Sequence, residues 1–153
     1  MRTIKFRAKH IMTGEWLYGS HYDDCGEEYI LPNQLNSAVD YEDYQVNPNT
    51  VGQFTGLTDV NGKEIYEGDI IVQHSEDMPD IRGAVVCDEA NARFGMSYTC
   101  HWESGAVTHF DTLERVKCYA DCNRELTYEV IGNIHDNQDL MLAKDINIFK
   151  CEM

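Results

Sequence analysis

The chain is short of positive charge. Its 153 residues include 12 Lys and Arg against 27 Asp and Glu, which gives a formal charge of −15 at pH 7. No Lys or Arg occurs between Lys9 and Lys63. Non-specific binding to nucleic-acid phosphates requires clustered Lys and Arg, and an anionic membrane surface attracts the same residues. The composition therefore argues against direct nucleic-acid binding and against binding to a membrane surface.

Long apolar runs are also missing. No segment approaches the ~18 consecutive apolar residues typical of a membrane-spanning helix. The sequence MRTIKFRAKH at the start lacks the continuous apolar core of a signal peptide. We therefore expect a cytoplasmic protein without a membrane segment. In that compartment the six cysteines are expected to be reduced thiols rather than disulfides.

Motifs of common catalytic sites are absent as well. The sequence contains no Gly-rich phosphate loop, and none of its Cys or Ser residues lies in a nucleophile elbow or a cysteine-protease string. Acidic pairs such as Asp23-Asp24 are expected by chance in so acidic a chain, and turns favour them. The sequence favours a protein that is not an enzyme and has no cofactor.

What the chain does contain is a succession of short strand patterns. Ile4, Phe6 and Ala8 alternate with charged residues, and a turn at 13–14 then predicts a hairpin over about residues 3–19. Similar runs recur at intervals of about ten residues with Gly-bearing turns between them, which is typical of a small barrel or sandwich. Three segments depart from this rhythm: a loop or short paired strands at 20–49, a polar loop at 74–80, and a short helix at about 111–121.

The most distinctive segment is QFTGLTDVNGKEIYEGDIIV at 53–72. Asn61-Gly62 predicts a type I′ hairpin turn, which needs positive φ at both central positions. A second turn before residue 70 leads into a buried strand. We assign structural roles to the residues of this segment: backbone freedom for the glycines, core packing for the tyrosine, and acceptance of backbone hydrogen bonds for the aspartate. These residues are Gly56, Asn61, Gly62, Tyr66, Gly68 and Asp69.

This segment resembles the signature of the YopX family, and two other patches are similar to it: IKFRA with a hairpin ending in Trp16, and YEVIGNIHDNQDLM at 128–141. YopX proteins are encoded mainly by phages and prophages of Gram-positive bacteria and have no established biochemical activity. The resemblance implies one compact, mainly β unit. Its expected parts are an N-terminal β-hairpin region at 1–63 and a small SH3-like β-barrel at 64–153, with at most one or two short helices. It implies no catalytic residues.

Zinc binding is the best chemical alternative. Cys118 and Cys122 are four residues apart and would share a helix face, while Cys100 and His101 precede them. Zinc takes about four thiolate or imidazole ligands in a tetrahedron. No CxxC pair is present, so free cysteines with histidines on strand faces are the favoured interpretation of the same residues.

We expect the protein to act by binding another protein of its bacterial host. Tyrosines with acidic neighbours suit such a surface, because tyrosine gives contact area at low entropic cost. The candidate surface residues lie in the irregular acidic stretch: Tyr22, Asp23, Asp24, Tyr41 and Tyr44. The same tyrosines could instead pack on the fold with their hydroxyls outward.

A second hypothesis is an acidic mimic of nucleic acid that inhibits a DNA-binding host factor. Homo-oligomers are also plausible, because small β proteins often protect their sheet edges by pairing.

Overall fold

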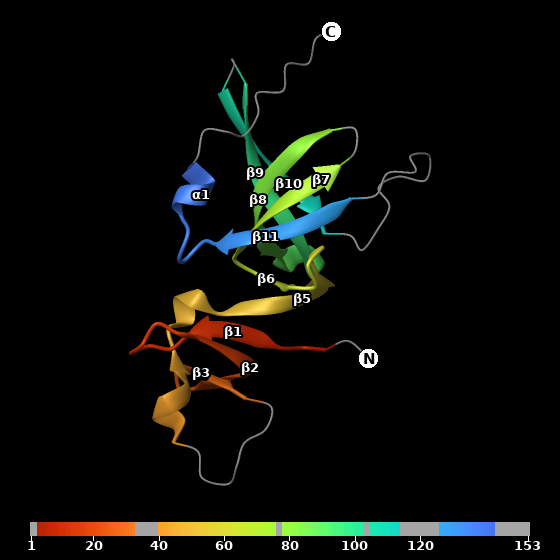
Figure 1. Cartoon of the computed structure of the whole chain (residues 1–153). Coiled ribbons are helices and arrows are strands. Elements are labelled where there is room, and N and C mark those ends of the chain that lie inside the picture. Colours follow the sequence, from red (N-terminus) through yellow and green to blue (C-terminus); the bar gives the residue numbers. More distant parts are fainter. Residues whose placement is uncertain (1–2, 33–39, 76–77, 103–104, 114–125, 143–153) are drawn as a thin grey trace. The chain divides into compact units, whose positions relative to one another are not determined.

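The computed structural model describes residues 3–32, 40–75, 78–102, 105–113 and 126–142. The chain divides into two compact units, Met1–Gly56 and Leu57–Met153 (Figure 1). Its strands form two antiparallel sheets, with the orders β4-β3-β2-β1-β5-β6 and β10-β9-β8-β7-β11. The expectation of a mainly β protein is confirmed. In the described part of the chain, no helix is long and apolar enough to cross a membrane.

The first unit is built on a small antiparallel sheet. Its elements are β1 (Phe6–Lys9), β2 (Trp16–Asp24), β3 (Glu27–Leu31), the 3-10 helix η1 (Tyr41–Tyr44), β4 (Gln45–Val46), the 3-10 helix η2 (Pro48–Thr50) and the first part of β5 (Gly52–Thr58). The predicted first hairpin is confirmed, since Lys9 pairs with Trp16 across the turn. One face of the sheet buries Ala8, Ile30 and Val46 as a small core.

The second unit contains the five-stranded sheet. Its further elements are β6 (Glu64–Tyr66), β7 (Asp69–Ser75), β8 (Met78–Asp88), the 3-10 helix η3 (Glu89–Asn91), β9 (Arg93–Trp102), β10 (Gly105–Thr112), β11 (Thr127–Asn133) and α1 (Asp139–Leu142). Alternate residues of the strands, among them Ile71, Val85 and Met96, fill the core. Gly83 is required there, because a Cβ atom would lie 2.5 Å from Cγ of Met96. Among the described residues, no strand pairing closes this sheet into a barrel.

The turns differ from the sequence expectations at one position and agree at another. The prediction of a type I′ turn at Asn61-Gly62 is wrong, because Gly62 has positive φ, at 79°, and Asn61 does not. Gly62 N–H donates to the Asp59 carbonyl and Asp59 N–H donates to the Lys63 carbonyl, the pattern of a three-residue loop that ends in a left-handed glycine. At the second turn, Oδ2 of the buried Asp69 accepts from Tyr66 N–H at 2.8 Å, as expected.

Two other segments are more regular than the sequence indicated. The polar loop expected at 74–80 is largely strand, because β7 runs to Ser75 and β8 starts at Met78. His74 there lies between two carboxylates, 2.9 Å from Asp80 and 3.5 Å from Glu129, so it links three neighbouring strands. Residues 111–112, expected to begin a helix, instead end β10, and 114–121 lie outside the described residues.

Asp59 connects the β5–β6 turn to β11. Its Oδ1 accepts the backbone N–H groups of Asn61 (2.8 Å) and Lys63 (2.9 Å), and its Oδ2 accepts that of Val130 (3.1 Å). Val60 N–H also donates to the Tyr128 carbonyl of β11. Burial raises the pKa of Asp59, but the three backbone donors outweigh burial and the net shift is downward.

We predict that Asp59→Asn lowers the free energy of unfolding by about 1–3 kcal/mol, because an amide NH₂ would face the Val130 N–H and leave a donor without an acceptor. A carboxylate with a depressed pKa stabilises above its unfolded pKa, and the effect is lost as pH falls through the folded value. The difference between wild type and Asp59→Asn should therefore be full at pH 7 and shrink below about pH 4. Urea unfolding at several pH values measures it.

The control is Glu89→Gln, which removes one carboxylate from an exposed residue of η3. It should leave the free energy of unfolding within about 0.5 kcal/mol of wild type. Equal stability of Asp59→Asn and Glu89→Gln at pH 7 would contradict the role given to Asp59.

Candidate protein-binding surface

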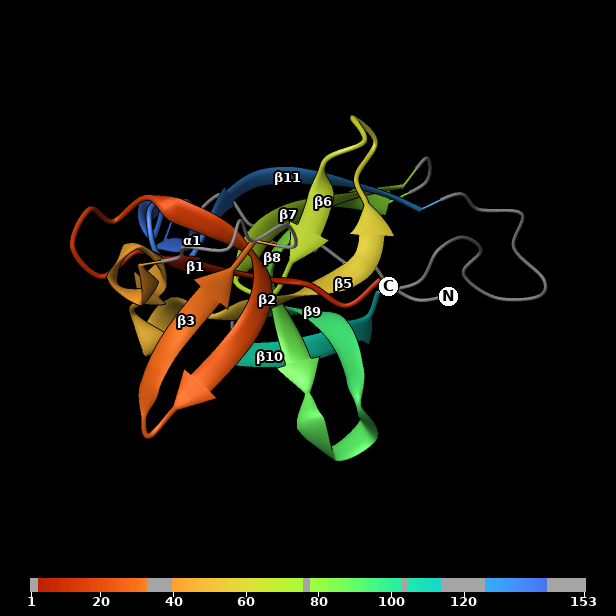
Figure 2. The same cartoon turned by 90° about the horizontal axis from the view of Figure 1, so that it is seen from below.

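The β2–β3 hairpin closes through a two-residue turn. Cys25 and Gly26 have φ of 54° and 92°, and Asp24 pairs with Glu27 across them. Positive φ at both central residues is the signature of a type I′ turn. The turn fixes which residues of β2 lie opposite which residues of β3. Figure 2 shows the hairpin as a two-stranded ribbon.

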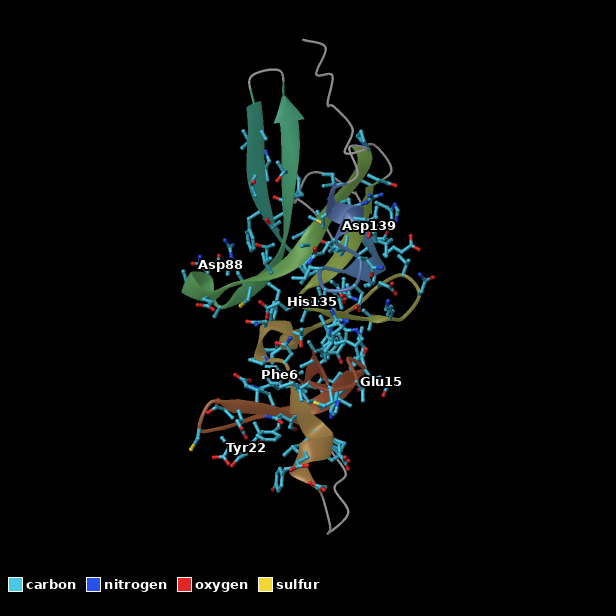
Figure 3. The ribbon with its side chains drawn as sticks, turned by 90° about the vertical axis from the view of Figure 1, so that its left-hand side faces the viewer. Phe6, Glu15, Tyr22, Asp88, His135 and Asp139 are labelled. Carbon is cyan, nitrogen blue, oxygen red and sulfur yellow. The ribbon has the colours of Figure 1, made fainter. Side chains whose placement is uncertain are left out.

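The register brings three tyrosines together on the outer face of this hairpin. Tyr22 lies directly opposite Tyr29, with ring centroids 6.3 Å apart. Tyr41 of η1 meets the Tyr29 ring edge-on at 6.1 Å. The core residue Ile30 alternates with Tyr29 along β3 and so points to the opposite face. Tyr22, labelled in Figure 3, is 47% exposed and Tyr41 is 53% exposed.

Carboxylates face carboxylates at the end of the hairpin. Asp24 pairs with Glu27, and Asp23 pairs with Glu28 on the next rung. Like charges directly opposite each other destabilise a strand pair. Two of these acids have partners, since Glu28 pairs with His21 and Glu27 accepts from the Tyr29 hydroxyl at 2.7 Å. Within the described residues, the side chains of Asp23 and Asp24 have no hydrogen bond or ion pair.

We call the outer face of the hairpin with Tyr41 the tyrosine–acid surface; it consists of Tyr22, Asp24, Glu27, Tyr29 and Tyr41. More acidic groups adjoin it, because Glu42 and Asp43 are exposed in the first turn of η1. The surface is therefore a row of aromatic rings bordered by negative charge.

The structure brings together some of the predicted surface residues and separates others. Tyr22, Asp24 and Tyr41 share the surface, whereas Asp23 alternates to the other face of β2 and Tyr44 is half-buried at the end of η1. The candidate surface residues did not include Glu27, nor Tyr29, although Tyr29 is one of the tyrosines of the acidic stretch. The string YDDCGEEY carries a signal for them, because Gly26 indicates a turn, and the halves on either side of Cys25-Gly26 mirror each other.

Only two of the four zinc candidates lie in the part of the chain that the structure describes. Cys100 is buried in the core of the second unit, and His101 lies in β9. Cys118 and Cys122 lie outside the described residues, so the zinc site stays a prediction. Within the described ranges, no group of three or more His, Cys, Asp or Glu side chains is placed to hold a metal ion.

Glu27 controls the ionisation of Tyr29. The hydrogen bond from the Tyr29 hydroxyl to Glu27, together with partial burial and nearby negative charge, raises the pKa of Tyr29 to about 12. We predict that Glu27→Gln lowers this pKa toward the ordinary value of about 10. Tyrosine ring NMR shifts followed through alkaline pH measure it. The control is Glu15→Gln, at an exposed residue before β2, which should leave the pKa of Tyr29 as in wild type. If Glu27→Gln also left this pKa as in wild type, the hydrogen bond between Tyr29 and Glu27 would be contradicted.

Comparison with known proteins places the chain in a family. No curated protein matches it. A crystal structure of protein EF1440 from Enterococcus faecalis is 24% identical, with 92% of this chain and 99% of that chain covered and a TM-score of 0.37. The family described as YopX protein matches residues 5–142, which is most of the chain. The protein therefore belongs to the YopX family.

Proposed function

We propose that this protein is a non-enzymatic binding module whose tyrosine–acid surface takes a basic segment of another cytoplasmic protein. The observation that carries the proposal is that the Tyr22–Tyr29 pair lies beside the Asp24–Glu27 pair on the hairpin. About half of the surface of Tyr22 and of Tyr41 is exposed to solvent. Exposed aromatic rings provide contact area, and the facing carboxylates provide a charge that only a cation neutralises.

Charge explains why the partner should be basic. A Lys or Arg that enters between Asp24 and Glu27 removes their mutual repulsion, so part of the binding energy comes from relief of a cost present in the free protein. Lys and Arg are absent from the sequence between residues 9 and 63, so the hairpin and the segments that flank it supply no such cation.

The arrangement of the aromatic rings also favours a cationic side chain at the tyrosine–acid surface. Guanidinium and ammonium groups bind over the faces of aromatic rings. Tyr29 is held by Tyr22, by Tyr41 and by its hydrogen bond to Glu27, so its ring is fixed before a partner arrives. Preorganised side chains lose little entropy on binding.

The setting of these carboxylates supports a binding role rather than catalysis. Asp23, Asp24 and Glu27 lie exposed along a two-stranded ribbon. Catalytic acids and bases usually lie in clefts, where exclusion of water shifts their pKa values. The second unit serves in this proposal as the scaffold; its five antiparallel strands are compatible with the SH3-like architecture expected from the family.

Asp24→Lys separates binding from stability. The substitution replaces a repulsive rung with an attractive one, so the free energy of unfolding should rise by about 0.2–1 kcal/mol. Partner capture should fall in the same variant, because the new charge repels a basic segment. Thermal or urea unfolding gives the first quantity, and affinity capture from the bacterial host with quantitative mass spectrometry gives the second.

Glu89→Lys is the matched control, because it makes the same change in net charge at an exposed residue of η3. A basic partner retained by Glu89→Lys and lost by Asp24→Lys supports the proposal. A partner that both variants retain, or that both lose equally, contradicts it. A captured DNA-binding protein displaced by duplex DNA would favour the nucleic-acid mimic instead.

A further inference from the structure

The five-stranded sheet ends in an open edge at β10. β10 pairs with β9 over its whole length, from Gly105–Trp102 to Thr112–Gly95, without a register shift. Among the described residues, no strand pairs with its other side. Figures 1 and 3 show β10 with β9 as one hairpin. Such an edge is a template for a further strand.

The backbone groups that point away from β9 can be assigned. Leu113 N–H donates to the Phe94 carbonyl of β9 at 3.1 Å. Because hydrogen-bonding direction alternates along an antiparallel strand, odd-numbered residues bond to β9 and even-numbered residues point outward. The outward N–H and C=O groups therefore belong to Ala106, Thr108, Phe110 and Thr112.

The opposite edge of the same sheet is protected. At β11, Val130 N–H donates to Asp59 and the Tyr128 carbonyl accepts from Val60 N–H. A register shift between Val130 and Gly132 also interrupts its regular pairing with β7. Both are devices that block addition of a strand. Within the residues that the structure describes, β10 has neither device, and its sequence contains no Lys or Pro.

The β10 edge carries little charge compared with the rest of the chain. The chain carries −15 overall, so two copies repel each other over most of their surface. β10 contributes one charged residue, Asp111, and its carboxylate accepts the Tyr98 hydroxyl at 2.8 Å. The four residues whose backbone groups point away from β9 have uncharged side chains. β10 is therefore a place where two copies can approach with little repulsion.

We propose that β10 pairs antiparallel with β10 of a second copy of this chain, joining two five-stranded sheets into one. Outward groups must face outward groups, so the two-fold axis passes at a residue rather than between residues. The registers that pair most of β10 (Gly105–Thr112) have this axis at Thr108 or at His109. In either register Thr108 N–H donates across the interface. The Phe110 ring packs over Gly95 of β9, and the Arg93 guanidinium lies 5.2 Å from its centroid, so the proposed interface is formed by backbone groups rather than by this ring.

Thr108→Pro tests the proposal, because it removes an N–H that points away from β9 and leaves the β9–β10 hydrogen bonds in place. Sedimentation equilibrium in reductant should show a concentration-dependent dimer for wild type, and the dissociation constant should rise about tenfold or more in the variant. Reductant prevents a disulfide between exposed Cys25 thiols of two copies. Thr108→Val keeps the N–H and should dimerise as wild type does.

Amide hydrogen exchange provides a readout that does not depend on a variant that may fail to fold. Protection at residues 106, 108 and 110 should grow with protein concentration, while protection at 107 and 109 should stay constant. A monomer at every concentration up to about 1 mM would overturn the proposal. So would a dimer that Thr108→Pro leaves intact, or even-numbered amides whose protection does not depend on concentration.

Discussion

The carboxylate of Asp59 is the contact on which the second unit most depends. It joins the β5–β6 turn to Val130, 71 residues further along the chain, and so fixes a long-range connection with one side chain. A buried carboxylate is costly unless hydrogen bonds compensate, and here three backbone donors do so. The same contact determines the turn. Because Asp59 already holds Asn61 and Lys63, the loop adopts a form in which only Gly62 needs positive φ.

One consequence of this contact is an asymmetric sheet. Asp59 and Val60 occupy the backbone groups of β11 that would otherwise be open, so strand addition is blocked at that end. β10 is left as the end where pairing can continue. Natural β proteins usually protect both edges, and among the described residues β10 has no such protection, which is the basis of the pairing that we propose.

The sequence determined the strands better than the turns. Alternating residues identified β1 and β9, because period-2 burial is a local property that any pairing partner preserves, and a continuous apolar run identified β7. The conformation at 61–62 could not be read locally, since it depends on a hydrogen bond between Asp59 and a strand some seventy residues away. The same applies to the binding surface. Tyr22, Tyr29 and Tyr41 are all tyrosines in acidic surroundings, but the position of Tyr29 opposite Tyr22 follows only from the register that the Cys25-Gly26 turn sets.

Solubility alone does not account for the acids of the β2–β3 hairpin. A soluble protein needs net charge, but it does not need carboxylates on two successive rungs of one strand pair, where they reduce its stability. A left-handed Cys25 at the turn adds a further local cost, because residues other than Gly, Asn and Asp rarely adopt that conformation. Departures from local consistency concentrate at functional sites. Two such departures lie within four residues of an exposed tyrosine row, which is why we propose this hairpin, rather than the acidic residues of the second unit, as the binding surface.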